Sequence, residues 1–332
     1  MNSKIARIEY HLPERVLTNE DLALEFPGWS PKKIESKIGI KQRHIAADNE
    51  TALDLAYSAS DKLLQGIDRS VVDFLILCTQ SPDYWLPTSA CILQNRLGLK
   101  TSTGAFDFNL GCSGFVYGLA VAKGLIGVGI AKNVLLITAE TYSKHLHKLD
   151  KGNRSIFGDG AAATLISASE QEGIHHFALG TDGSGCSNLI LKNGGARHPC
   201  DPEAADLTDE GGNIRNDNKL YMNGPEIFNF TIEAVPKLIT AALENNKTSL
   251  SEIDYFVFHQ ANQYMLKYLR DTIGISENKF YISMSDTGNT VSSTIPIALK
   301  DATGKGIIGA GDKVLLAGFG VGYSYGATII TM

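Results

Sequence analysis

The chain has 332 residues, of which 43% are hydrophobic and 20% charged, and its formal net charge is −6. These values are ordinary for a globular protein and exclude a disordered, collagen-like or coiled-coil chain. An acidic balance without a basic stripe also argues against a nucleic-acid partner. Two counts need an explanation: glycine is frequent, at 33 residues, and cysteine is odd in number, at five.

The N-terminal segment and the longest apolar run show no sign of export or of membrane insertion. Residues 1–9 lack the apolar core of a signal peptide. The longest apolar run, 115–131, contains Lys123 and four glycines, and it is shorter than the roughly 20 apolar residues of a spanning helix. We therefore expect a buried core helix, no membrane partner, a cytoplasmic location and reduced cysteines.

Strand-like and helix-like runs alternate along the chain, which predicts a layered α/β protein. In the first half, strands at 71–78 and 105–109 are followed by a glycine-containing loop, a helix and a strand at 133–138. The order recurs in the second half, with strands at 254–258, 279–284 and 313–317.

This repeat predicts two duplicated halves, 1–170 and 171–332. The second carries a loop-rich excursion at about 181–224, and loops of that length commonly cover a site or are mobile. Unrelated α/β units that happen to alternate are the alternative.

The repeat places Cys112 between a strand and a helix, and sites in open α/β sheets form beyond the carboxyl ends of strands. Backbone N–H groups and the helix dipole should lower the pKa of a thiol there. Gly111 and Gly114 would let a substrate approach closely. The alternative is a small core residue, which is our interpretation of Cys78 and Cys91.

Two further side chains take related places. His259 ends strand 254–258, a placement that the other seven histidines lack, although a structural histidine is the alternative. Asn289 is the counterpart of Cys112, and a helix cap is its alternative role. Cys186 and Cys200 fall in the excursion without metal-ligand spacing, so no metal is expected. Together, Cys, His and Asn predict a thiol-based acyl-transfer site.

Six segments spread over the chain match one known family in order and spacing: 39–46, 108–115, 157–161, 259–262, 288–290 and 318–326. Through them the chain resembles the thiolase-fold condensing enzymes, in particular the β-ketoacyl-acyl-carrier-protein synthase III family. The resemblance implies a thiolase-like fold with a five-layer αβαβα core and pseudo-twofold symmetry. The last segment lacks the second cysteine of degradative thiolases, and Asn289 stands where the other elongating synthases have a second histidine.

The resemblance also implies a mechanism. Cys112 would take an acyl group from a thioester, and malonyl-acyl carrier protein would then lose CO₂ and attack it, giving a β-ketoacyl thioester. This reaction belongs to fatty-acid or secondary-metabolite synthesis and needs no permanently bound cofactor. His259 and Asn289 would hold the enolate oxygen. The oxyanion hole would use the backbone N–H groups of Cys112 and of the loop Gly320, Val321 and Gly322.

The expected substrate entrance departs from the family. Coenzyme A is usually bound there by a Trp and several Arg, whereas this chain has Lys33, Lys37 and Lys151, and Tyr264 stands two residues after Asn262. Unlike arginine, lysine cannot stack on an aromatic ring or bind a phosphate through two parallel hydrogen bonds. An acyl-acyl-carrier-protein donor or an unusual acyl-coenzyme A therefore becomes more plausible.

Trp85 and Leu86 lie where the family sends a residue into the acyl pocket of a second subunit, which implies a homodimer. Plain surface aromatics are the alternative. Two other functions stay open: a non-elongating acyltransferase that passes the acyl group to an alcohol, amine or aromatic acceptor, and a non-catalytic subunit of a heterodimeric synthase.

Overall fold

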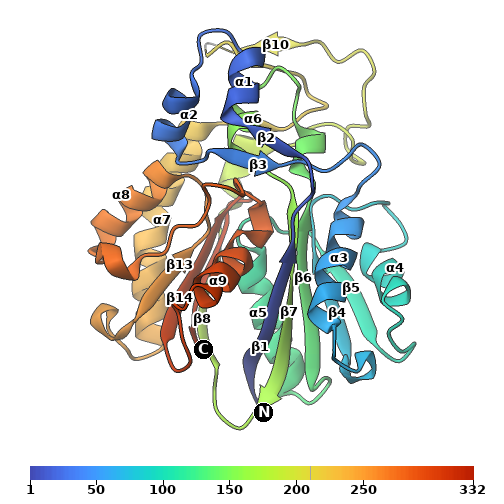
Figure 1. Cartoon of the computed structure of the whole chain (residues 1–332), viewed down its shortest axis with the longest axis vertical. Coiled ribbons are helices and arrows are strands. Elements are labelled where there is room, and N and C mark those ends of the chain that lie inside the picture. The colour runs from blue at the N-terminus through green and yellow to red at the C-terminus, as the bar shows by residue number, and fades with distance from the viewer. Residues whose placement is uncertain (210) are drawn as a thin grey trace.

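The structure is a computed structural model that describes residues 1–209 and 211–332. Two β-sheets form its framework (Figure 1). The first has the strand order β1-β7-β6-β4-β5 and the second the order β13-β14-β15-β8. The strands are β1 (Asn2–His11), β4 (Phe74–Cys78), β5 (Gly104–Phe108), β6 (Asn133–Glu140), β7 (Gly160–Ser169), β8 (Ile174–Thr181), β13 (Tyr255–Phe258), β14 (Lys313–Gly320) and β15 (Ser324–Thr331).

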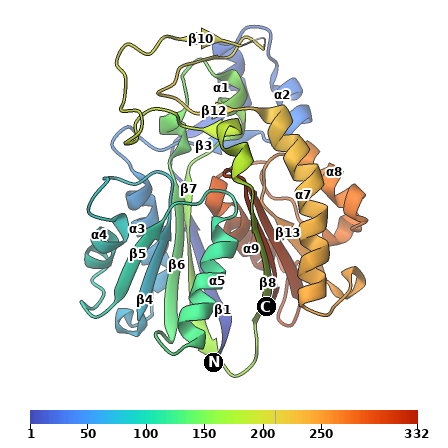
Figure 2. The ribbon, with the colours of Figure 1, turned by 180° about the vertical axis from the view of Figure 1, so that it is seen from behind.

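Helices cover both outer faces of the sheets and fill the space between them (Figures 1 and 2). One pair packs on the first sheet, a second pair lies between the sheets, and a third pair packs on the second sheet. The predicted five-layer αβαβα arrangement is therefore confirmed. In the order of these pairs, the helices are α3 (Ala52–Leu64) and α4 (Ser89–Arg96), α5 (Gly114–Gly127) and α9 (Thr294–Gly304), and α7 (Gly224–Asn245) and α8 (Gln263–Ile273).

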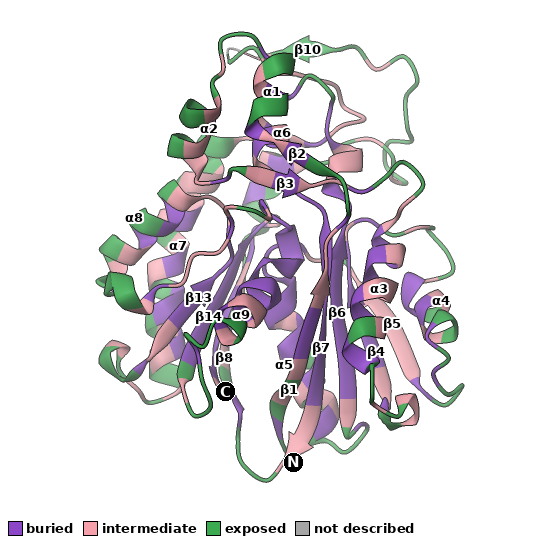
Figure 3. Cartoon of the chain, viewed as in Figure 1, coloured by how far each residue is buried: buried purple, intermediate pink, exposed green. Residues whose placement is uncertain are grey.

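The central layer is the apolar core of the molecule, and Figure 3 shows its elements largely buried. Helix α5 is the helix expected within residues 115–131, and it is apolar on nearly all sides because both sheets contact it. A Cβ on Gly118 would lie 2.5 Å from Leu136 Cδ1, so glycine permits close packing on β6. No helix within 1–209 and 211–332 is long and apolar enough to span a bilayer.

Short elements gather over one end of the two sheets (Figure 1). Within the predicted excursion 181–224, of which residue 210 lies outside the described part, short strands pair into two ribbons, β10 with β11 and β12 with β9. The excursion is thus more regular than a plain loop. The elements are β2 (Val16–Thr18), α1 (Asn19–Glu25), α2 (Pro31–Ile38), β3 (Gln42–His44), α6 (Lys151–Ile156), β9 (Leu189–Ile190), β10 (Leu207–Thr208), β11 (Ile214–Arg215) and β12 (Tyr221–Met222).

The predicted strand 279–284 is wrong. The segment makes one isolated bridge, between Phe280 and Phe256, because side chains from elsewhere take its polar groups. Gln260 Oε1 accepts from the Ser283 backbone N–H at 2.7 Å, and the Tyr281 hydroxyl donates to an Asp301 carboxylate oxygen at 2.7 Å. These bonds replace a sheet ladder.

The cysteines differ in burial. Cys78 and Cys112 are buried, whereas Cys91, Cys186 and Cys200 are exposed, and all five are free thiols. The core role predicted for Cys91 is wrong, because its place on the short helix α4 faces away from the first sheet's apolar cluster.

Candidate active site

Cys112 lies in the loop between β5 and α5, and 6% of its surface is exposed. Strand β14 passes directly beside it. A Cβ on Gly320 would lie 2.8 Å from Cys112 Sγ, and one on Gly318 would lie 2.6 Å from the Cys112 carbonyl oxygen. Contacts this short exclude a side chain at either position. Part of the glycine excess therefore lets the second sheet reach the thiol.

The thiol is more basic than the sequence predicts. Burial raises the pKa of Cys112 to about 12, and the charge of Glu140 acts in the same direction. The backbone N–H groups of Val321 and of Cys112 itself lower that pKa, but by less. The expected net lowering by the helix terminus is wrong, because a fully buried thiolate loses more hydration than these two donors return.

The four residues predicted for the oxyanion hole take different places. The backbone N–H groups of Cys112 and Val321 lower the pKa of the Cys112 thiol. Gly320 instead pairs with Ser324 in the β14–β15 ladder. Gly322 has a φ of +136°, a conformation open to glycine, and carries the turn between these two strands.

His259 follows β13 and is 2% exposed. Its backbone N–H donates to the Ala317 carbonyl oxygen at 2.8 Å, which extends the pairing with β14. Nδ1 lies 2.7 Å from Thr294 Oγ1, at the start of α9. Burial lowers the pKa of His259 to about 3, although the backbone of Val291 raises it slightly. The imidazole is therefore neutral at physiological pH.

Asn289 is 4% exposed and lies just before α9. Its Oδ1 accepts from the Val291 N–H at 2.9 Å, which leaves Nδ2 as a donor with only a long contact, 3.5 Å, to the Ala261 carbonyl oxygen. Val291 has a φ of +55°, which is rare for a β-branched residue and typical of strained functional loops. The loop thus aims an amide N–H rather than a carbonyl into the site.

Two of these three side chains, Cys112 and His259, lie beside β14. The Phe319 ring packs edge-on against His259, with centroids 5.8 Å apart, and the next residue, Gly320, contacts the sulfur of Cys112. The backbone N–H of Asn289 donates to the Ile156 carbonyl oxygen at 2.9 Å, which joins its loop to the first half of the chain. Both halves therefore contribute to one buried site.

Glu140, at the end of β6, is a buried carboxyl group that accepts several hydrogen bonds near this site. Its carboxyl accepts from the Gln80 backbone N–H at 3.1 Å, from Ser81 Oγ at 3.1 Å and from Ser292 Oγ at 3.1 Å. Burial raises the pKa of Glu140 to about 8. Glu140 was not among the predicted site residues, since its only signal in the sequence is an acidic side chain at the end of an apolar strand.

The predicted entrance residues lie on or beside three helices, α2, α6 and α8. Lys33 and Lys37 of α2 line a cavity of about 100 Å³ together with Trp29, a residue that was not predicted. Lys151, the first residue of α6, has its Nζ 5.8 Å from the Trp29 ring centroid. The signal for Trp29 is an apolar residue directly before the helix cap, here Ser30, which pairs with an apolar residue in the first turn, here Ile34.

The other two entrance residues lie at the start of α8, which packs against α2. Asn262 caps this helix, with Oδ1 accepting from the Met265 N–H at 2.9 Å. Tyr264 is 63% exposed and its ring lies 5.7 Å from that of Phe228. Tyr264 is thus free to contact a large substrate, whereas Asn262 has a structural task.

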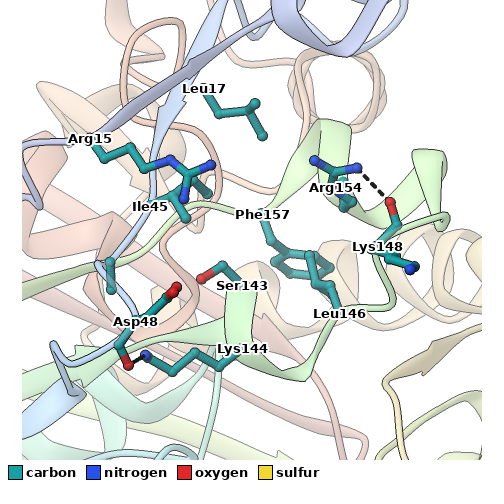
Figure 4. A pocket seen from close by; sticks show the side chains of 11 residues that line it. Arg15, Leu17, Ile45, Asp48, Ser143, Lys144, Leu146, Lys148, Arg154 and Phe157 are labelled. Atoms are coloured by element: carbon teal, nitrogen blue, oxygen red, sulfur yellow. Dashed lines mark hydrogen bonds between the residues drawn. The ribbon is translucent and has the colours of Figure 1, made fainter. Parts of the chain in front are cut away.

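Figure 4 shows a separate pocket of about 240 Å³. Its wall includes Phe157, which also belongs to the buried cluster around Cys112. Lys144 and Arg154 each donate to a backbone carbonyl oxygen in this wall, at 2.9 and 2.5 Å. We assign no substrate to the pocket. Among the described residues, no three His, Cys, Asp or Glu side chains gather as metal ligands.

Comparison with known proteins identifies the family. The model described as 3-oxoacyl-[acyl-carrier-protein (ACP)] synthase III matches residues 106–183, and its C-terminal counterpart matches residues 243–332. Beta-ketoacyl-[acyl-carrier-protein] synthase III of Clostridium perfringens is 36% identical over 100% of this chain and 99% of its own. The protein of that name from Fusobacterium nucleatum is 37% identical, over 97% and 96%.

Solved structures agree. A crystal structure of 3-oxoacyl-(acyl-carrier-protein) synthase III has 50% sequence identity and a TM-score of 0.98, over 100% of both chains. A 3-oxoacyl-(acyl-carrier protein) synthase from Burkholderia xenovorans has 33% identity and a TM-score of 0.92, over 100% of this chain and 94% of that one. The chain therefore belongs to the 3-oxoacyl-[acyl-carrier-protein] synthase III family, and the predicted thiolase-like fold and condensing acyltransferase activity are confirmed.

Proposed function

We propose that Cys112 carries the acyl group and that His259 and Asn289 promote decarboxylation of a malonyl thioester. The observation that carries this assignment is a buried thiol at the meeting of the two halves of the chain, where a Cβ on Gly320 of β14 would lie only 2.8 Å from the sulfur of Cys112. A neutral histidine and an oriented amide donor come from neighbouring loops. The arrangement fits an acyl-transfer site in which charge develops on oxygen.

In the first step, Cys112 Sγ attacks the carbonyl carbon of an acyl thioester. The N–H groups of Cys112 and Val321 stabilise the tetrahedral oxyanion, which collapses as the carrier C–S bond breaks. The proton of the thiol ends on the departing carrier thiol. The acyl group remains on Cys112.

In the second step, the malonyl thioester loses CO₂, and the electron pair of the broken C–C bond forms an enolate. Its oxygen accepts from His259 Nε2–H and from Asn289 Nδ2–H. The enolate carbon attacks the acyl carbon, the C–S bond to Cys112 breaks, and a β-ketoacyl thioester leaves. The thiolate then takes a proton from water, which its raised pKa favours.

The test of this proposal is a mixture of the protein, an acyl thioester and malonyl-acyl carrier protein. We expect CO₂ release and a product whose mass equals the acyl group plus a two-carbon unit on the carrier protein. Acyl transfer without CO₂ release would instead assign a non-elongating transferase. The two results differ in product mass, so a single spectrum separates them.

Thr294 is proposed as the positioning residue for His259. Thr294 Oγ1 lies 2.7 Å from Nδ1 and 3.0 Å from the Val291 carbonyl oxygen, and it has one proton to donate to either of them. When the hydroxyl donates to Nδ1, the imidazole proton lies on Nε2, where the enolate needs it. Thr294→Val keeps the shape and removes the donor, and we expect kcat for condensation to fall roughly 10²-fold. KM should change little, the acidic limb of the pH profile should move, and Thr294→Ser should restore the rate. An unchanged profile would reduce Thr294 to a structural role.

We propose that the lysines of α2 receive the phosphorylated carrier of either substrate, acyl-coenzyme A or acyl carrier protein. Lys33 and Lys37 are exposed beside Trp29, and Lys151 adds a third charge. Lys33→Glu and Lys37→Glu should each raise KM about fivefold at low salt with kcat unchanged. Lys32→Glu, exposed on the same helix but outside the cavity, is the matched control. Equal effects at all three positions would indicate only long-range charge.

We also propose that the chain is a homodimer. Strand β5 is an edge of the first sheet, and edge strands offer unpaired backbone groups to a second chain. Nearby, Trp85 and Leu86 are 80% and 82% exposed. Light scattering should give twice the chain mass of 35.8 kDa, and Trp85→Ser with Leu86→Ser should weaken the association. The cytoplasmic location and the division at residue 170 stay predictions.

A further inference from the structure

A cavity of about 570 Å³ lies beside the proposed nucleophile. Val321, which packs against the buried cluster that contains Cys112, lines it. Tyr142, Leu189 and Leu220 also line it, and these three pack in the same buried cluster as Cys112. The cavity is therefore the space available to an acyl group carried on the sulfur.

One wall of this cavity is polar. The Tyr142 hydroxyl donates to Gln80 Oε1, and Gln80 Nε2 donates to Asn109 Oδ1 at 2.9 Å. A Cβ on Gly111 would lie 2.6 Å from Gln80 Oε1, so this network begins beside the residue that precedes Cys112. The polar groups are thus close to the thioester end of the acyl group.

His145 extends the polar wall, which corrects the expectation that only His259 has a placement at a strand end. It closes the short 3-10 helix η2 (Tyr142–His145) directly after β6. Its ring packs edge-on to Tyr142, with centroids 6.1 Å apart, and Nε2 lies 3.4 Å from Ser81 Oγ. Burial, and secondarily the charge of Lys219, lower the pKa of His145, so the ring is neutral.

The network has unused hydrogen-bonding capacity. Each side-chain amide nitrogen carries two N–H groups. Gln80 Nε2 uses one of them, and Asn109 Nδ2 donates to no protein acceptor among the described residues. An alkyl chain would cover these donors without replacing the water they bind, whereas an oxygen on the acyl group would accept from them. Sites built in this way discriminate strongly against analogues that lack the polar group.

The charge of the cavity wall further limits which ligands fit. In the described part of the chain, no Lys or Arg lines the cavity, and Asp83 lies on it. A carboxylate on the acyl chain would find no cation there. The bound group is therefore a neutral oxygen, of a hydroxyl or a ketone.

We propose that the site around Cys112 selects a neutral, oxygenated acyl group over an unsubstituted alkyl acyl group. The added oxygen accepts from the amide nitrogens of Gln80 and Asn109, and the Tyr142 hydroxyl holds the Gln80 amide in place. The proposal rests on the function assigned to Cys112 above. It makes Gln80 and Asn109 determinants of specificity and Tyr142 a positioning residue for Gln80, whereas the reacting carbonyl group contacts the oxyanion hole.

The test measures single-turnover acylation of Cys112 by intact mass. The probes are N-acetylcysteamine thioesters, which need no carrier recognition. The alkyl probes are butanoyl and hexanoyl. Their oxygenated partners carry one hydroxyl or ketone oxygen, at C3 of butanoyl and at C3 or C5 of hexanoyl. At least one oxygenated probe should react about tenfold or more faster than its alkyl partner. Gln80→Met and Tyr142→Phe keep the size of the side chain and should remove most of this preference while retaining alkyl acylation.

Asn193→Ala is the matched control, because Asn193 lines the same cavity but pairs with Asn218, at 3.1 Å, outside the network of Tyr142, Gln80 and Asn109. It should keep the wild-type preference. Equal or faster acylation by alkyl probes in the wild type would overturn the specificity and leave the proposed function intact. Absence of any acyl adduct, from these probes and from carrier-bound donors, would overturn both.

Discussion

Cys112→Ala is expected to remove the acyl adduct completely and to lower β-ketoacyl product formation by roughly 10³-fold or more. The substitution removes the sulfur that carries the acyl group in the proposed mechanism, and the alanine methyl supplies no nucleophile in its place. Intact mass before and after incubation with an acyl thioester measures the adduct. The assay needs no knowledge of the second substrate, which makes it the most direct test of the site.

Cys91→Ser is the control for this substitution, because Cys91 is an exposed free thiol and reacts with thioesters if reactivity follows accessibility alone. It should keep the full adduct. An adduct that survives in Cys112→Ala and disappears in Cys91→Ser would assign the chemistry to the surface and refute the site.

The reactivity of the Cys112 thiol should rise with pH across the neutral range. Because burial raises the pKa of Cys112 to about 12, the thiol is protonated throughout the neutral range. Its thiolate fraction then rises about tenfold per pH unit up to that value. Alkylation of Cys112 by iodoacetamide should follow this slope between pH 6 and 9 without a plateau. A plateau near pH 7 would restore the lowered pKa that the sequence suggests.

This contrast shows what the sequence can and cannot predict. The positions of Cys112 and His259 follow from local signals, because apolar strands end where polar or glycine-rich turns begin. The position of Asn289 follows from the internal repeat instead, since the strand expected before it does not form. A helix terminus near Cys112 is also a local signal. Burial is not, because it depends on β14 and on residues more than two hundred positions away. The direction of the pKa shift therefore needed the fold.

Contacts with side chains distant in the sequence explain the other differences between prediction and structure. The segment 279–284 has a strand-like composition, but Gln260 and Asp301 bind its polar groups. His145 has no distinguishing neighbours in sequence, and its role emerges only where Tyr142 and Ser81 meet it across the end of the first sheet. In each case the deciding partner is distant in the chain, so no local pattern predicts it.

His259→Ala and Asn289→Ala should separate the two half-reactions. Each variant should keep acylation of Cys112 within about tenfold and lower CO₂ release from malonyl-acyl carrier protein by roughly 10²–10³-fold. The reason is geometric: each removes one of two donors to the enolate oxygen and neither supplies an oxyanion-hole N–H. Intact mass and trapped CO₂ measure the two steps independently.

Two further variants make this separation specific. Asn289→His restores a ring N–H donor at that place and should recover part of the CO₂ release lost in Asn289→Ala. His176→Ala, at an exposed position on β8, should alter neither step. Combining His259→Ala with Asn289→Ala should cost less than the product of the two single losses, because both donors serve one oxygen atom. If acylation falls as far as decarboxylation in both single variants, the two side chains act on Cys112 itself and the enolate assignment is wrong.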